Sequence, residues 1–126
     1  MNIKIIEADN GKIALCHSGE AIITDGQTAL DFFANIGYEH DCRHIAVNKS
    51  AICEGFFDLS TGIAGEVAQK FVNYGIRFAI IGDFSEYTSK SLSDYIYECN
   101  QNGPLYFVAD EHEALAKLGE GLWNDA

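Results

Sequence analysis

The chain has 126 residues, close to the usual size of one domain, and 48% of them are hydrophobic, which indicates an ordinary globular core. Its formal net charge is −11 and it contains no cluster of lysine or arginine. This balance argues against binding to nucleic acid or to an anionic membrane surface. The first residues show no signal-peptide pattern, and no apolar run is long enough to cross a bilayer. We therefore expect a cytoplasmic protein that is not attached to a membrane.

The first part of the chain predicts a β-hairpin followed by a helix. Residues 2–7 and 12–17 are extended runs joined by a turn at Asn10-Gly11, and residues 20–24 can form a further short strand. A helix capped by Thr24 or Asp25 then runs to about Tyr38.

The rest of the chain alternates between short apolar runs and helical patterns. The predicted strands and helices follow one another in the order strand 44–48, helix 60–74, strand 77–82, helix 92–101, strand 105–109 and helix 111–118. Gly119 is expected to end the last helix, leaving 119–126 as a loosely held tail in which Trp123 can dock on the body or on a neighbouring chain. Such alternation predicts a single α/β domain, with a hairpin and about three β-α repeats around a mostly parallel sheet.

Four cysteines are spread along the chain. They are Cys16, Cys42, Cys53 and Cys99, each within or beside a predicted core element. A domain of this size folds without disulfides, so we interpret them as reduced, mostly packed thiols.

The segment "FFDLSTGIAGEVAQKF" places Asp58, Ser60, Thr61, Gly62 and Gly65 at the head of an apolar helix. The simplest reading is that a hydroxyl caps the helix. A second reading is an anion-binding or phosphorylated helix start, because glycine in a first helical turn costs about 1 kcal/mol relative to alanine and permits close approach. Gly65 can instead serve tight packing of the helix on the sheet.

The ends of the predicted strands carry the other candidate residues. These are Asn48 and Lys49, then Asp83, Phe84 and Ser85, and finally Asp110. Open α/β sheets bind ligands beyond the carboxyl ends of their strands. Lys49 can neutralise an acidic partner or ligand, or be a solvated loop lysine. Asp83 can orient a hydroxyl, or cap a turn.

Metal and catalytic sites receive little support from the sequence. His40, Cys42 and His44 alternate in "HDCRH", but structural zinc normally needs four ligands and no second Cys/His pair completes the set. There is no G-x-S-x-G elbow, no G-x-G-x-x-G after a strand and no P-loop. We therefore expect no metal, no cofactor and no enzymatic activity.

Four stretches resemble the STAS domains, the sulphate-transporter and anti-sigma-factor-antagonist module of bacteria. They are "HIAVNKS", "FFDLSTGIAGE", "GIRFAIIGDFS" and "GPLYFVADEHEAL", within about residues 43–118. Ser60-Thr61-Gly62-Ile63 matches the family's hydroxyl-hydroxyl-Gly-apolar helix start, where the resemblance implies phosphorylation by a partner kinase. Leu59 departs from the pattern by separating Asp58 from the hydroxyl pair. Over its whole length the chain also resembles a bacterial family known as domain-of-unknown-function family 4180, which implies no activity.

The leading hypothesis is a non-enzymatic regulatory domain that binds another protein, a kinase or sigma-factor regulator by resemblance, and is switched at Ser60 or Thr61. Its surface would comprise the strand end at Asn48 and Lys49, the helix start at Asp58, Ser60 and Thr61, and the Asp83-Phe84-Ser85 loop with Tyr87. The alternative is a small-molecule or anion-binding site, with an apolar pocket at the strand ends. That pocket would be lined by Phe56, Phe57, Phe84 and Tyr87, with Lys49 and Asp83 converging on it.

A homodimer using Tyr97 or Trp123 is a further hypothesis.

Overall fold

The computed structural model describes residues 1–8 and 11–123, with side chains to residue 119. It confirms a mixed α/β domain built on a five-stranded sheet in the order β1-β2-β3-β4-β5. The strands are β1 (Asn2–Ala8), β2 (Gly11–His17), β3 (His44–Asn48), β4 (Arg77–Ile81) and β5 (Leu105–Val108). β1 pairs antiparallel with β2, and the pairs from β2 to β5 are parallel, as expected from the alternating pattern.

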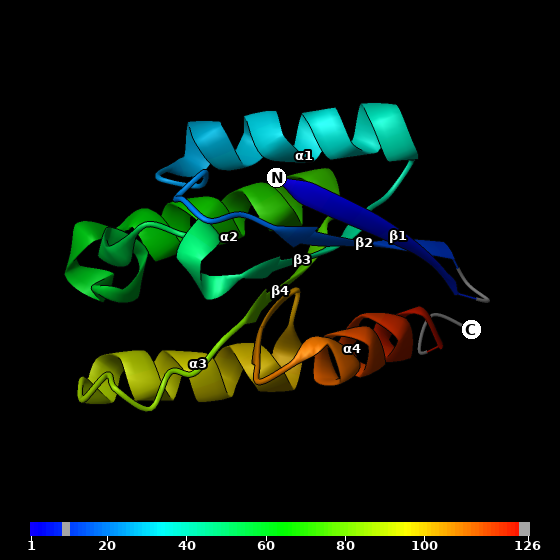
Figure 1. Cartoon of the computed structure of the whole chain (residues 1–126). Helices are drawn as coiled ribbons and strands as arrows, with labels where there is room; N and C mark the ends of the chain where they lie inside the picture. The colour runs from blue at the N-terminus through cyan, green and yellow to red at the C-terminus, as the bar shows by residue number, and fades with distance from the viewer. Residues whose placement is uncertain (9–10, 124–126) are drawn as a thin grey trace.

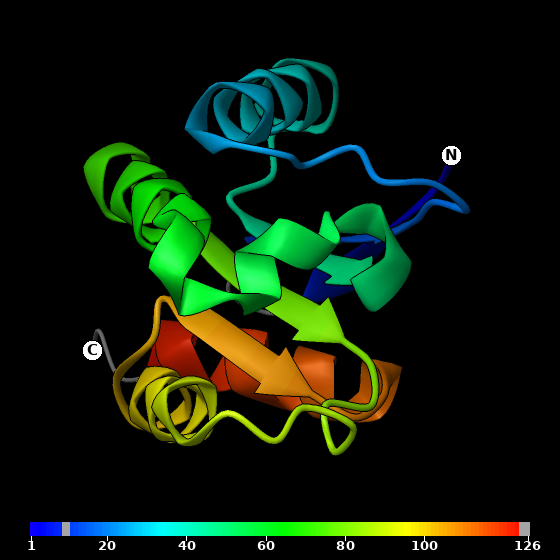
Figure 2. The same cartoon turned by 90° about the vertical axis from the view of Figure 1, so that its left-hand side faces the viewer.

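Helices cover both faces of the sheet. They are α1 (Gly26–His40), α2 (Ile63–Tyr74), α3 (Lys90–Asn102) and α4 (Glu111–Trp123). Figures 1 and 2 show α1 and α2 on one side of the sheet and α4 on the other, while α3 lies along β5. Short 3₁₀ turns η1 (Lys49–Ala51), η2 (Glu54–Phe57) and η3 (Leu59–Thr61) connect β3 to α2.

Two hydrophobic clusters form the core, one on each face. On the α1–α2 face, Phe71 stacks on Phe78 with ring centres 4.7 Å apart, and Phe33 packs against both rings. On the α4 face, Leu118 is completely buried and belongs to a cluster with Leu15 and other residues of the strands. Because β3, β4 and β5 are buried between these layers, their sequences are continuous apolar runs rather than alternating ones.

Several helix ends follow the sequence signals. Asp25 caps α1 through a hydrogen bond from the Thr28 backbone, and the Thr28 hydroxyl accepts from the Asp25 backbone in return, which completes a capping box. Gly75 ends α2 in a left-handed conformation, and Asp110 accepts from the Glu113 backbone at the start of α4.

Other expectations about elements are wrong. Gly119 does not end the last helix, because α4 continues to Trp123. The segment 20–24 forms no strand but only an isolated bridge between Ile23 and Ile52. Gly65 does not serve tight packing, since a Cβ placed there would meet nothing within 4 Å. The predicted turn at Asn10 and the docking of the Trp123 side chain lie outside the described residues.

The remaining predicted features are placed as follows. Cys16 and Cys42 are buried, Cys53 and Cys99 are half-buried, and all are free thiols. Tyr97 on α3 is 69% exposed, which leaves the homodimer a prediction. No helix in the described part of the chain has both the length and the apolar character needed to span a membrane.

Candidate functional site

Two loops at the carboxyl ends of β3 and β4 hold most of the predicted site residues. We call residues 49–62 and 83–87 together the two-loop surface. The first loop contains the three 3₁₀ turns, and the second leads from β4 toward α3. The loops lie beside each other because β3 and β4 are paired in parallel along their whole length.

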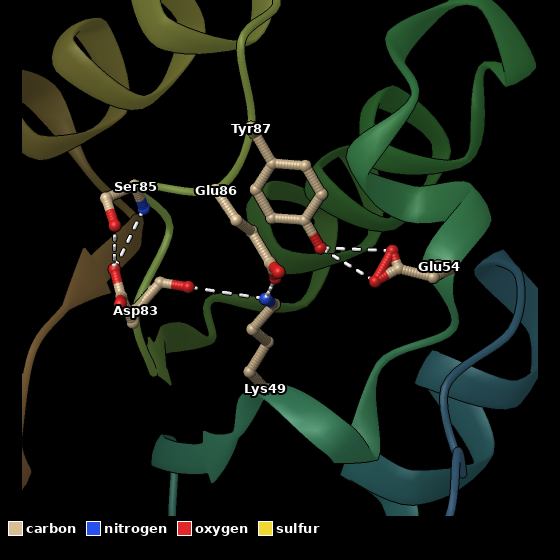
Figure 3. Close-up of polar contacts among 6 residues, drawn as sticks. All are labelled: Lys49, Glu54, Asp83, Ser85, Glu86 and Tyr87. Atoms are coloured by element: carbon tan, nitrogen blue, oxygen red, sulfur yellow. Dashed lines mark hydrogen bonds and ion pairs between the residues drawn. The ribbon is translucent and has the colours of Figure 1, made fainter.

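Lys49 joins the two loops. Its ammonium group pairs with the Glu86 carboxylate and donates to the Asp83 carbonyl over 3.3 Å (Figure 3). The same nitrogen lies 4.6 Å from the centre of the Tyr87 ring, a cation–π distance. Only 21% of the Lys49 side chain is exposed, so the alternative of a freely solvated loop lysine is wrong. Lys49 neutralises an acid of its own chain.

Gly82 makes this position of Lys49 possible. A Cβ at residue 82 would lie 2.7 Å from the Cβ of Lys49, closer than real side chains approach one another. The stem of Lys49 therefore runs directly over the backbone at the end of β4. Burial lowers the pKa of Lys49, but the hydrogen bond to Glu86 and the contacts with Tyr87 outweigh it and leave the pKa above its usual value.

Tyr87 makes a second link between the loops. Its hydroxyl donates to the Glu54 carboxylate, with oxygen–oxygen distances of 2.8 and 3.0 Å (Figure 3). Burial and the bond to Glu54 raise the pKa of the Tyr87 phenol. Glu54 and Glu86 were missed by the sequence analysis, since single acids in polar loops carry no recognisable pattern. The scarcity of basic residues was the one available hint that Lys49 would have an acidic partner.

Both loops contain the same small turn, an aspartate followed two residues later by a serine. Asp58 accepts from the Ser60 hydroxyl at 2.6 Å and from the Ser60 backbone at 3.1 Å. Asp83 accepts from the Ser85 hydroxyl at 2.6 Å and from the Ser85 backbone at 2.9 Å. In each case the serine hydroxyl, followed by the serine backbone, lowers the pKa of the aspartate. The two carboxylates thus remain ionised and fixed in orientation on an exposed surface.

Ser60 and Thr61 do not lie at the start of α2, which corrects the sequence interpretation. They belong to η3, and Gly62 separates them from α2 with a φ of 79°, a conformation that glycine adopts readily. The Thr61 hydroxyl donates toward the carbonyls of Gly55 and Asp58 and accepts from the Ile63 backbone. Thr61 therefore holds the turn together, whereas the Ser60 hydroxyl bonds to an exposed carboxylate.

Aromatic rings fill the space beneath the two-loop surface. Phe57 stacks on Tyr87 at 5.2 Å and also contacts Phe56 and Phe84, while Phe56 is completely buried. Of the four rings expected to line an apolar pocket, Phe56 and Phe57 are buried in the core, whereas Phe84 and Tyr87 line an open hollow. Open hollows lie beside the second loop, one of about 260 Å³ next to α3 and one of about 480 Å³ next to α4.

The remaining predicted residues are Asn48, whose side-chain amide donates to the Ser50 hydroxyl of the first loop at 3.1 Å, and the set of His40, Cys42 and His44, which lies outside the two-loop surface. Asn48 faces the end of β2, where its side chain accepts from the Ser18 backbone at 2.9 Å and donates to the Ser18 carbonyl at 2.6 Å. His40 ends α1, Cys42 is buried in the following loop and His44 begins β3. Within residues 1–8 and 11–123, no three His, Cys, Asp or Glu side chains gather in a way that could hold a metal ion.

Comparison with known families places the chain in one of them. A family model described as a domain of unknown function, DUF4180, matches residues 8–118, and the chain belongs to this family. No match was found among curated proteins or among solved structures.

Proposed function

We propose that this member of the DUF4180 family is a non-enzymatic regulatory domain that binds another protein through the two-loop surface. The observation that carries the proposal is the position of Lys49, which ties one loop to the other through Glu86, the Asp83 carbonyl and the Tyr87 ring. Loops that are already fixed lose little conformational freedom on binding, so more of the contact energy becomes affinity.

The exposed part of the two-loop surface is negatively charged. Asp58, Asp83 and Glu86 are exposed, whereas the positive charge of Lys49 is taken up by Glu86. A partner with basic side chains complements such a surface, and the net charge of −11 would speed its approach. The identity of the partner as a kinase or a sigma-factor regulator, and the bacterial origin, are parts of the proposal that rest on the STAS resemblance. The cytoplasmic compartment is a further part, which rests on reading the four cysteines as reduced thiols.

Phosphorylation of Ser60 is the proposed switch. Of the two hydroxyls, that of Thr61 is used by the backbone around it, while that of Ser60 contacts the exposed Asp58 carboxylate at 2.6 Å. A phosphate on Ser60 would carry about −1.5 to −2 charges. It would repel Asp58, open the turn and change the affinity of the partner.

A site-specific photo-crosslinker in the native cells tests the binding surface. Placed at Ser85, it should couple the chain to one protein, and placed at the exposed Gln69 of α2 it should not. Equal coupling from both positions would reject the surface. Mass spectrometry of the protein from growing and stressed cells tests the switch, and finding no phosphate on Ser60 in any condition would reject it. Ser60→Asp should alter the coupling from Ser85, with Ser91→Asp on α3 as the matched control.

A further inference from the structure

A separate hollow lies on the α4 face of the sheet, away from the rings beneath the two-loop surface. Its volume of about 360 Å³ is near the lower end of the range of roughly 300–1,000 Å³ found for small-molecule sites. It lies at the carboxyl ends of β2, β3 and β4, the edge where open α/β sheets bind ligands. Its walls include Asn2, Lys4, Leu15, His17, Ile81 and Glu111.

The pairing of β1 with β2 places polar and apolar groups side by side in this hollow. Lys4 is the cross-strand partner of Leu15, and Asn2 is the partner of His17. Directly paired residues of antiparallel strands project on the same face of the sheet. Leu15 belongs to the apolar cluster beneath α4, and Ile81 packs against that cluster. The hollow thus has an apolar floor and a rim that includes an ammonium group.

Two opposite charges line the hollow without neutralising each other. Lys4 is exposed on β1, and Glu111 is exposed in the first turn of α4. Among the described residues, Lys49 and Lys90 form ion pairs with carboxylates of this chain, but neither Lys4 nor Glu111 does. A ligand carrying both a negative and a positive group would complement the two side chains at once.

We propose that this hollow binds a small zwitterion with an aliphatic side chain, a free amino acid of the leucine type. The ligand carboxylate pairs with Lys4, its ammonium group pairs with Glu111, and its side chain covers Leu15 and Ile81. Asn2 and His17 at the rim supply further hydrogen-bonding groups. None of these residues belongs to the two-loop surface, so the inference stands or falls independently of the function proposed above.

Titration of the ¹⁵N-labelled full chain with L-leucine, followed by NMR, tests this site. Amide signals of β1, the end of β2 and the start of α4 should shift at ligand concentrations up to about 10 mM. Lys4→Gln and Glu111→Gln should each weaken binding by about tenfold or more. Lys12→Gln is the matched control on β2, because Lys12 alternates with Ile13 and projects on the other face. Glu113→Gln is the control on α4.

Two truncated ligands separate the roles of the charges. Isocaproate lacks the ammonium group, so it should bind more weakly than leucine and its affinity should not respond to Glu111→Gln. Isoamylamine lacks the carboxylate, so its affinity should not respond to Lys4→Gln. The proposal is overturned by an absence of shifts with leucine, by shifts confined to other elements, by equal affinities of leucine and isocaproate, or by Lys4→Gln binding leucine as well as Lys12→Gln does.

Discussion

The ammonium nitrogen of Lys49 lies 4.6 Å from the centre of the Tyr87 ring, although the two residues belong to different loops. Tyr87 in turn donates to Glu54 in the loop that carries Lys49. The two loops are therefore joined by two separate contacts, the cation–π contact of Lys49 and the hydrogen bond of Tyr87. Breaking one contact should loosen both loops together.

Replacing Lys49 with methionine should lower the free energy of unfolding by about 1 kcal/mol, because the change keeps the apolar stem and removes the ion pair and the cation–π contact. Lys90→Met is the matched control, since Lys90 forms an exposed pair with Asp94 one helical turn away. That pair should be worth only about 0.3–0.5 kcal/mol. Urea denaturation measures both variants, and an equal loss in the two would contradict the role of Lys49.

Adding one methyl group at two glycines should have opposite effects. Gly82→Ala should destabilise the fold by about 1–3 kcal/mol, because the new Cβ would clash with the Cβ of Lys49. Gly65→Ala should stabilise it by up to about 1 kcal/mol, because Gly65 lies in α2 with open space around it. Thermal unfolding of both variants gives the comparison. A stable Gly82→Ala protein would show that Lys49 does not need its observed position.

Ser60→Ala should raise the pKa of Asp58, because the Ser60 hydroxyl is the main group that lowers it. A lowered carboxyl pKa stabilises the fold above the ordinary aspartate pKa of about 3.9, and the benefit is lost as the pH falls through the lowered value. The stability difference between the wild type and Ser60→Ala should therefore be present at neutral pH and disappear in strong acid. NMR titration of the carboxyl carbon reports the pKa directly. An Asp58 pKa that is the same in both proteins would refute the expectation, and Ser91→Ala should leave it unchanged.

Cys16 should resist alkylation in the folded protein. Burial, helped by the nearby Cys42, raises the pKa of the Cys16 thiol to about 12. At pH 8 a thiol with this pKa is only about one part in ten thousand thiolate, the reactive form. Timed labelling with iodoacetamide and peptide mass spectrometry should find Cys16 modified only after urea is added. Labelling of Cys16 at the same rate as in urea would show that the ends of the sheet open easily.

Local patterns in the sequence determined the elements and most of their limits. Apolar runs marked β3, β4 and β5, the side chain of Asp25 marked the start of α1, and Gly75 marked the end of α2. These features depend on neighbours within about four residues, so the order of residue types was sufficient. The alternation of strands and helices also predicted that the strands are parallel, because a helix between two strands carries the chain back to the starting end of the sheet.

The tertiary structure alone decided the strand order, the partners of Lys49 and the break before α2. Glu86 pairs with Lys49, and Glu54 accepts a hydrogen bond from Tyr87. The two residues of each pair are far apart in the sequence, and no local pattern specifies such pairs. The segment of Ser60 and Thr61 looked like a helix start, but it forms the separate 3₁₀ helix η3, and the left-handed Gly62 separates η3 from α2. Burial of Phe56 and Phe57 under the two loops accompanies that break, because both rings pack into the core from η2, before α2 begins. Packing between distant residues, rather than local preference, fixed this part of the molecule.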